Sequence, residues 1–388
     1  MIRFEHVTKR YPDGTTAVDD LSFEVSQGEL VTLVGPSGCG KTTTMKMVNR
    51  LIEPTGGRIF LDGEDISAVD PVQLRRRIGY VIQQVGLFPH KTVLENTATV
   101  PHLLGWQRRK GRERAAELLD LVGLDPSVYG DRYPEQLSGG QRQRVGVARA
   151  LAADPPVLLM DEPFGAVDPV VRDHLQSEFL KLQAAVRKTV LFVTHDIEEA
   201  VRLGDRIAVY GQGTIEQFDA PAAVLGAPAT PYVADFVGAD RGLKRLSVTP
   251  IEEGDLEQPP VLHLDDPLRN AAAKLAERGA RWAVVLDSKD NLHGWISTEQ
   301  TASSGTVREH ARRMEAWLPV GASLKQAFAT MLQHDAGWIA VIDKEETGRF
   351  LGVLTPARLH EALRRSIDAD AQAIPRTEVE LKTISQVS

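Results

Sequence analysis

The chain has 388 residues, too many for one ordinary domain and enough for two. Its net charge of −8 argues against a dedicated nucleic-acid-binding protein, and its hydrophobic (42%) and charged (25%) fractions are those of globular proteins. The single cysteine, Cys39, excludes an intrachain disulfide, and no apolar run is long enough to cross a bilayer. Because the start carries no secretory signal pattern, we expect a cytosolic chain that reaches a membrane only through a partner.

The first 235 residues alternate short apolar runs with longer runs of helical periodicity. Runs such as ELVTLVG, PVLLMDE and TVLFVTH predict buried strands, and QRQRVGVARALA predicts a helix. This alternation favours an α/β fold with a mainly parallel sheet. Proline clusters at 221–231 and 250–267 indicate a boundary, so we expect a first domain at 1–235 and a linker at 236–246. The polar, aperiodic residues 366–388 predict a mobile tail.

Residues 35–43 read GPSGCGKTT, follow an apolar strand and open a helix, which is the pattern of a phosphate-binding P-loop. Its glycines let backbone N–H groups face phosphate oxygens, and the helix start adds positive potential. Lys41 can reach the β- and γ-phosphates, and the Thr42 hydroxyl can bind Mg²⁺. The predicted nucleotide-binding residues here are Gly35, Pro36, Ser37, Gly38, Cys39, Gly40, Lys41, Thr42 and Thr43.

Two further apolar strands end in polar residues that suit ATP hydrolysis. Asp161 ends the run VLLMD and is predicted to hold the metal ion. Glu162 follows it directly, where a carboxylate can polarise an attacking water as a general base. His195 stands at the tip of TVLFVT, where α/β folds place ligand-binding groups, and is expected to contact the γ-phosphate.

The segment LSGGQRQRVGVARAL at 137–151 predicts a second anion site. Ser138 is a suitable N-cap, two glycines free the backbone, and an amphipathic helix follows. Since the P-loop already cradles one ATP, the simplest arrangement is a head-to-tail dimer in which this segment completes the site of a second copy. The residues assigned to that role are Ser138, Gly139, Gly140 and Gln141.

With these motifs in this order, residues 1–235 resemble the ATPase subunit of an ABC transporter. The resemblance implies a P-loop NTPase fold with a helical subdomain, ATP and Mg²⁺ as cofactors, and a dimer that sandwiches two nucleotides. It also implies that Tyr11 stacks on adenine, that Gln83 meets Mg²⁺ and signals to the membrane subunits, and that Asp168 forms the D-loop. Docking on an integral-membrane permease through the region from Gln83 to Glu95 would hold the chain at the cytoplasmic face of the membrane.

An internal tandem repeat follows the ATPase motifs. Residues 268–287 align with 324–343 without a gap, which pairs Trp282 with Trp338, and each copy reads helix, strand, turn, strand. The repeat resembles a pair of α+β cystathionine-β-synthase-like (CBS) modules, which we place at 247–301 and 305–365.

An ABC ATPase that ends in a CBS pair resembles the importers of quaternary amines such as glycine betaine, carnitine, choline and proline betaine. The resemblance implies that an extracytoplasmic substrate-binding protein selects the cargo. Two alternatives stay open: an importer of another small solute, and a soluble, non-transport ABC ATPase that acts on nucleic acid or ribosomes. The single ATPase unit, without a coiled-coil or zinc insertion, favours transport and no nucleic-acid partner.

The CBS-like copies lack one residue of nucleotide-binding modules. In such modules an Asp three residues after a Ser or Thr holds the ribose hydroxyls, but here Gln300 follows Ser297 and Arg358 follows Thr355. The sequence therefore disfavours ordinary AMP or ATP binding at the pair. Three alternatives are left: the pair dimerises, it binds a cyclic dinucleotide, or it senses ionic strength through its charged surface.

Overall fold

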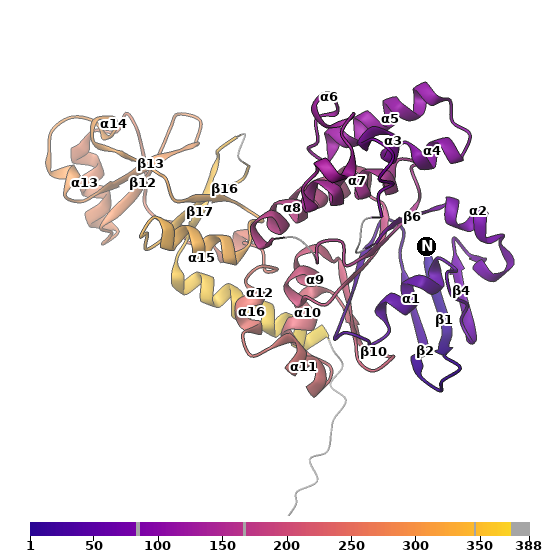
Figure 1. Ribbon diagram of the computed structural model, residues 1–388. Coiled ribbons are helices and arrows are strands. Elements are labelled where there is room, and N and C mark those ends of the chain that lie inside the picture. The colour runs from indigo at the N-terminus through magenta and orange to yellow at the C-terminus, as the bar shows by residue number, and fades with distance from the viewer. Residues whose placement is uncertain (83–85, 166–167, 345–346, 374–388) are drawn as a thin grey trace, which may run out of the picture. The chain divides into compact units, whose positions relative to one another are not determined.

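The computed structural model describes residues 1–82, 86–165, 168–344 and 347–373 (Figure 1). The chain forms two compact units. The first comprises Met1–Val224 and Pro228–Gly238, and the second comprises Leu225–Ala227 and the chain from Ala239 onward.

The first unit is built on a six-stranded sheet in the order β10-β9-β3-β8-β7-β6. All neighbouring strands are parallel except the edge pair β10 and β9, which confirms the predicted α/β fold. Strands β3 and β8 are buried along their whole length, as expected for central parallel strands covered on both faces. The strands are β3 (Leu30–Val34), β6 (Ile78–Val81), β7 (Val157–Asp161), β8 (Thr189–Thr194), β9 (Arg206–Tyr210) and β10 (Ile215–Asp219).

An antiparallel sheet in the order β2-β1-β4-β5 packs beside it and was not predicted. Ile2, Phe4 and Val7 of β1 enter the same hydrophobic core as Leu33 of the central sheet. The register shift between Phe4 and Val7 places these buried residues three apart, which breaks the alternation that a period-two search requires. The strands are β1 (Ile2–Arg10), β2 (Thr16–Val25), β4 (Gly56–Leu61) and β5 (Glu64–Asp65).

Helices α3 to α7 gather at one end of this unit and form the helical subdomain (Figure 1). Leu118 and Leu119 of α5 and Val145 and Ala148 of α7 belong to a second hydrophobic core, which they share with strands β7 and β8. The helices of this unit are α1 (Lys41–Val48), α2 (Pro71–Arg76), α3 (Val93–Thr97), α4 (Thr99–Leu103), α5 (Arg108–Leu121), α6 (Pro126–Tyr129), α7 (Gly139–Leu151), α8 (Pro169–Val186), α9 (Ile197–Leu203) and α11 (Pro231–Val237); α10 (Pro221–Gly226) straddles the boundary between units.

The second unit contains the two copies of the repeat, each with the predicted helix, strand, turn and strand. The first sheet runs β11-β12-β13-β14 and the second β15-β16-β17. Their strands are β11 (Val261–His263), β12 (Trp282–Leu286), β13 (Leu292–Ser297), β14 (Arg312–Arg313), β15 (Trp317–Pro319), β16 (Ile339–Ile342) and β17 (Phe350–Leu354). The helices are α12 (Arg241–Arg245), α13 (Leu268–Glu277), α14 (Val307–His310), α15 (Leu324–Gln333) and α16 (Pro356–Ala373).

Two of these helices lie where the sequence predicted none. Helix α12 occupies the segment expected to be a linker, and it is too short to show helical periodicity. Helix α16 runs into the segment expected to be a mobile tail and continues to Ala373.

The two copies meet through equivalent residues. The rings of Trp282 and Trp338 stack with centroids 4.0 Å apart and planes 10° apart. The amide of Leu292 donates to the carbonyl of Gly348 at 2.8 Å, and the amide of Phe350 donates to the carbonyl of Asp290 at 3.2 Å. Because these bonds link corresponding positions in opposite directions, the two copies are related by an approximate two-fold axis.

No helix among the residues described here combines the length and apolar character required to cross a membrane.

Candidate active site

The P-loop connects β3 to α1 in a conformation that depends on glycine. Gly40 has φ of +111°, and a Cβ there would lie 2.3 Å from the carbonyl oxygen of Ala17. The Lys41 side chain is 5% exposed and folds back over the loop, where its Nζ donates to the carbonyls of Gly35 (2.7 Å) and Pro36 (2.8 Å). The loop thus holds the Lys41 ammonium group against its own backbone carbonyls.

The remaining P-loop positions differ in exposure. Gly38 has φ of +83° and open space around it, whereas Cys39 is buried. Pro36 and Ser37 are exposed, and Thr43 is half-buried. The exposed positions leave the outer face of the loop open to a ligand. The buried Cys39 fits the role of a small side chain that fills space within the loop.

The two predicted metal-binding side chains that the structure describes lie together. Thr42 Oγ1 donates to Asp161 Oδ1 at 3.0 Å, which joins the start of α1 to the end of β7. Burial raises the pKa of Asp161 above its ordinary value, opposed by the Thr42 hydrogen bond and reinforced by the neighbouring Glu162. A partly buried carboxylate beside a hydroxyl is a donor set that fits Mg²⁺, which prefers oxygen ligands and retains few protein contacts.

Glu162 and His195 meet at the carboxyl end of the central sheet. Glu162 Oε2 lies 3.3 Å from His195 Nδ1, and the Glu162 amide donates to the Val193 carbonyl at 3.0 Å. Glu162 has φ of +44°, an uncommon conformation for a non-glycine residue that turns the chain sharply after β7. The carboxylate and the imidazole therefore come from adjacent strands and face the same edge, where α/β sheets bind ligands.

The LSGGQ segment forms the expected helix start. Ser138 Oγ accepts from the Gln141 amide at 3.3 Å, and the Ser138 amide donates to Gln141 Oε1 at 2.9 Å, which is a capping box. Ser138 and Gly139 are exposed, so the positive end of α7 is open to an anion. One residue at this helix escaped the sequence reasoning: Gln143, whose Nε2 donates to the Pro163 carbonyl just beyond Glu162. A neutral glutamine within a helix gives no sequence signal for such a role.

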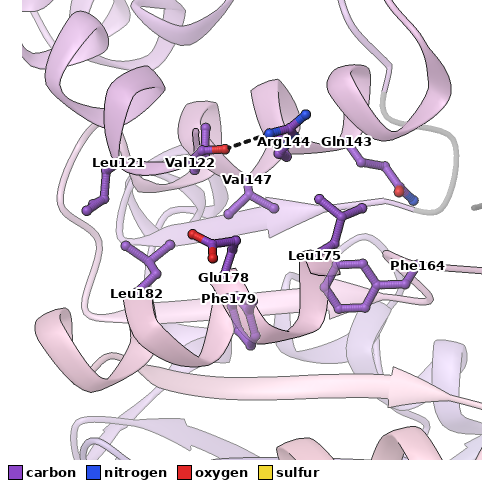
Figure 2. A pocket seen from close by; sticks show the side chains of 10 residues that line it. All are labelled: Leu121, Val122, Gln143, Arg144, Val147, Phe164, Leu175, Glu178, Phe179 and Leu182. Carbon is purple, nitrogen blue, oxygen red and sulfur yellow. Dashed lines mark hydrogen bonds between the residues drawn. The ribbon is translucent and has the colours of Figure 1, made fainter. Parts of the chain in front are cut away.

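A small apolar cavity of about 30 Å³ lies between α7 and α8 (Figure 2). At its rim, Arg144 Nη1 donates to the carbonyl of Val122 at 3.3 Å. Helix α8 begins at the predicted D-loop residue Asp168, whose carboxylate caps the helix by accepting from the Val170 amide at 3.0 Å. The cavity therefore lies in the contact between α7, which carries the LSGGQ segment, and α8, which begins at Asp168. The cavity is lined by Leu121, Val122, Gln143, Arg144, Val147, Phe164, Leu175, Glu178, Phe179 and Leu182.

Tyr11 makes none of the contacts described above. Tyr11 is half-buried just after β1; its amide donates to the Thr15 carbonyl at 2.8 Å, and its ring lies 5.3 Å from Lys9 Nζ. Gln83 lies outside the described residues.

In the second unit, the positions that lack the ribose-binding Asp serve structural contacts. Gln300 Oε1 accepts from the Ser297 amide at 2.9 Å, and Gln300 Nε2 donates to the His310 carbonyl at 2.8 Å. Arg358 forms ion pairs with Glu257 (3.3 Å) and Glu361 (2.9 Å). Neither position offers a carboxylate to a ribose.

Two family models match the chain. The model described as "ABC transporter" matches residues 18–165, and the model described as "CBS domain" matches residues 307–365.

Curated relatives match nearly the whole chain. The carnitine transport ATP-binding protein OpuCA of Listeria monocytogenes is 46% identical over 374 residues, covering 95% of this chain and 93% of the relative. The glycine betaine/carnitine/choline transport ATP-binding protein OpuCA of Bacillus subtilis is 44% identical, covering 96% and 98%. The osmoprotectant import ATP-binding protein OsmV of Salmonella typhimurium is 43% identical, covering 92% and 94%.

Solved structures match the first unit. The ATP-binding cassette MJ0796, in a dimeric post-hydrolysis state bound to ADP and Pi, aligns with a TM-score of 0.52 and 36% identity over 57% of this chain and 99% of that chain. The structure of cbiO1 from Clostridium perfringens, part of the ABC transporter complex cbiONQ, aligns with a TM-score of 0.55 and 26% identity over 59% of this chain and 91% of that chain.

Proposed function

The chain belongs to the ATP-binding proteins of ABC transporters, and from that premise we propose that its ATP hydrolysis drives the import of quaternary amines of the glycine betaine, carnitine and choline type. The observation that carries the chemistry is the convergence of four residues in one site. Thr42 Oγ1 meets Asp161 at 3.0 Å, and Glu162 meets His195 at 3.3 Å. The cargo class is supported by relatives whose names specify carnitine, glycine betaine and choline transport.

In this proposal the P-loop amides and Lys41 bind the β- and γ-phosphates of ATP, and Tyr11 stacks on the adenine. Thr42, Asp161 and Gln83 are the residues that would hold Mg²⁺, which when bound neutralises charge on the phosphate oxygens. Bringing the Lys41 ammonium onto phosphate requires exchanging its bonds to Gly35 and Pro36 for bonds to oxygen anions, which are stronger because both partners are charged.

Glu162 is the proposed general base. Its carboxylate accepts a proton from the attacking water, and His195, 3.3 Å away, orients the carboxylate and contacts the γ-phosphate. The positive φ of Glu162 turns the chain sharply after β7, and its carboxylate lies beside His195. Gln143 holds the loop behind Glu162 through the Pro163 carbonyl, so we assign it a positioning role.

A second copy of the chain is the proposed partner at the ATP site. Ser138, Gly139, Gly140 and Gln141 open an exposed helix start that would bind the γ-phosphate of the partner's ATP, and Asp168 would lie at the same interface. The dimeric ABC cassette bound to ADP and Pi, 36% identical to this chain, supports this arrangement.

The complex is proposed to include integral-membrane permease subunits, docked near residues 83–95, which hold the chain at the cytoplasmic face of the membrane. An extracytoplasmic substrate-binding protein would select the cargo. We also propose a domain division into an ATPase at 1–235, a connection at 236–246 that contains α12, and CBS modules at 247–301 and 305–365. The remaining segment, 366–388, begins with the end of helix α16, which continues to Ala373. The CBS pair would regulate transport; dimerisation, a cyclic dinucleotide and ionic strength are its alternative signals.

Transport by the reconstituted complex tests this proposal. Vesicles that contain the permease, the substrate-binding protein and this chain should accumulate labelled glycine betaine only when ATP is supplied on the face of the membrane that carries this chain. Unlabelled carnitine and choline should compete, whereas a sugar or an unmethylated amino acid should not. Accumulation that is independent of ATP, or ATPase activity that no quaternary amine stimulates, would exclude the proposed function.

A further inference from the structure

The second unit contains a cavity of about 320 Å³ that the ATP chemistry does not use. It lies where the two copies of the repeat meet, and its volume falls at the lower end of the range of small-molecule sites, about 300 to 1,000 Å³. Three of the five tryptophans of the chain line it: Trp282, Trp295 and Trp338. Such a concentration of indole rings at one cavity suggests a ligand that binds to aromatic surfaces.

The indole rings are held in place before any ligand arrives. Trp282 and Trp338 stack on each other with centroids 4.0 Å apart, and both pack against the small core of Val284, Leu286 and Val353. Trp295 already carries a cation on its ring, because the Arg312 guanidinium carbon lies 5.5 Å from the ring centroid. An aromatic wall fixed in this way loses little entropy on binding, and its rings attract positive charge.

The charged side chains around the cavity carry both signs. Glu315 and Asp335 supply carboxylates, and Arg313 supplies a guanidinium. His334 Nδ1 lies 3.8 Å from Glu315, which links the turn before β16 to the segment before β15. Carboxylates beside indole rings favour a bulky cation, and a guanidinium on the same rim favours a ligand that also carries a carboxylate.

From this combination we propose that the cavity binds a zwitterionic quaternary amine of the betaine type. The trimethylammonium group lies against the tryptophans near Glu315 and Asp335, and the ligand carboxylate pairs with Arg313. The absence of a ribose-binding carboxylate at Gln300 and Arg358 agrees with a ligand other than an adenine nucleotide. The inference rests on the proposed function for its ligand class, and it gives the CBS pair the means to sense the accumulated cargo.

Calorimetric titration of the full-length chain with glycine betaine tests the proposal. We expect binding in the millimolar range (~1 to 10 mM), typical of a few cation–π contacts. The isostere 3,3-dimethylbutanoate should bind at least about tenfold more weakly, because it keeps the shape and the carboxylate but replaces the trimethylammonium cation with a neutral tert-butyl group. Equal binding of the isostere, or no binding of glycine betaine, would overturn the proposal.

Variants assign the binding to this cavity. Trp295→Leu should weaken glycine betaine binding about 3- to 30-fold, whereas Trp317→Phe, in the same unit but outside the cavity lining, should leave it unchanged. Arg313→Met, at an exposed position, should weaken the binding of glycine betaine but not that of choline, which lacks a carboxylate. Unchanged betaine binding in both cavity variants would contradict the assignment, as would AMP displacing the ligand at micromolar concentration.

The ATPase activity of the same preparation separates the two proposals. Chain that hydrolyses ATP and supports transport but binds no betaine at the cavity refutes only the cavity site. Chain that binds betaine through the tryptophans but drives no ATP-dependent import refutes only the transport role.

Discussion

In the ATP-binding unit, Thr42 and Asp161 lie 119 residues apart in sequence and 3.0 Å apart in space, whereas in the C-terminal unit Gln300 bonds to Ser297, three residues away. Each pair joins the end of a strand to the first turn of a helix or of a 3-10 helix, so the folds supply similar positions. The first unit uses such positions to assemble a site from distant motifs. The second uses them to stabilise its own turns, so that substitutions at these positions should affect chemistry in one unit and only stability in the other.

The largest expected effect is at Glu162. Replacing this carboxylate in Glu162→Gln removes the general base and should lower the rate of ATP turnover about 10²- to 10⁴-fold, while ATP still binds. Steady-state phosphate release and nucleotide binding would measure the two properties separately. Glu198→Gln, an exposed carboxylate in the first turn of α9, is the matched control and should keep the parental rate. A Glu162→Gln protein that hydrolyses at the parental rate would remove Glu162 from the mechanism.

Asp161→Asn should separate metal binding from stability. Loss of this proposed metal ligand should raise the Mg²⁺ concentration needed for half-maximal hydrolysis at least about tenfold, measured by metal titration. The nucleotide-free variant should nevertheless have a higher Tm than the parent, because it no longer buries a charge.

The pH dependence of that gain has a definite sign. Since burial raises the folded pKa of Asp161 above its ordinary 3.8, the folded state holds the proton more tightly and loses relative stability as pH rises through that window. The Tm difference between variant and parent should therefore be largest near pH 7 and should shrink toward zero as the pH falls toward 4. A difference that grows on acidification would contradict the burial explanation.

Leu324→Ala should destabilise the second unit without affecting ATP hydrolysis by the first. Leu324 is 0% exposed in the core of the second copy, so its truncation should cost about 2 to 5 kcal/mol of unfolding free energy in that unit. Differential scanning calorimetry should show one shifted transition, while ATP hydrolysis at a temperature below both transitions persists. Lys325→Ala, its exposed neighbour, is the control. Complete loss of hydrolysis would mean that the second unit is needed for catalysis.

The smallest effect is expected at Arg358. Its ion pairs with Glu257 and Glu361 join partly exposed side chains, and such pairs contribute about 0 to 1 kcal/mol each. Arg358→Gln should therefore change the Tm by no more than a few degrees and leave ATP hydrolysis unaltered. A large loss of regulation without a loss of stability would instead assign Arg358 to a ligand.

The ATP-binding unit was predictable because its chemistry demands residue types at fixed spacing. The P-loop glycines, the acidic pair after VLLM and the histidine after TVLFVT each follow a strand, so their convergence at one sheet edge follows from the α/β fold. The bond from Gln143 to the Pro163 carbonyl was not predictable, because it depends on where α7 packs. Strand β1 was missed because register shifts break its alternation.

In the C-terminal unit, the repeat and its order of elements were predicted correctly from the alignment of the copies. The stacking of Trp282 on Trp338 could not be predicted, since equivalence in sequence does not imply contact in space. The tryptophan-lined cavity depends on that contact and on Trp295, which has no tryptophan counterpart in the second copy.

The reciprocal bonds between Leu292 and Gly348 and between Phe350 and Asp290 record how the C-terminal unit arose. In a homodimer of single modules, equivalent residues of the two copies contact each other across a two-fold axis, as they do here. We infer that a gene duplication joined two such modules in one chain and made their association intramolecular. Once the halves were joined, they could diverge at equivalent positions: Trp295 corresponds to Val353, and Gln300 corresponds to Arg358.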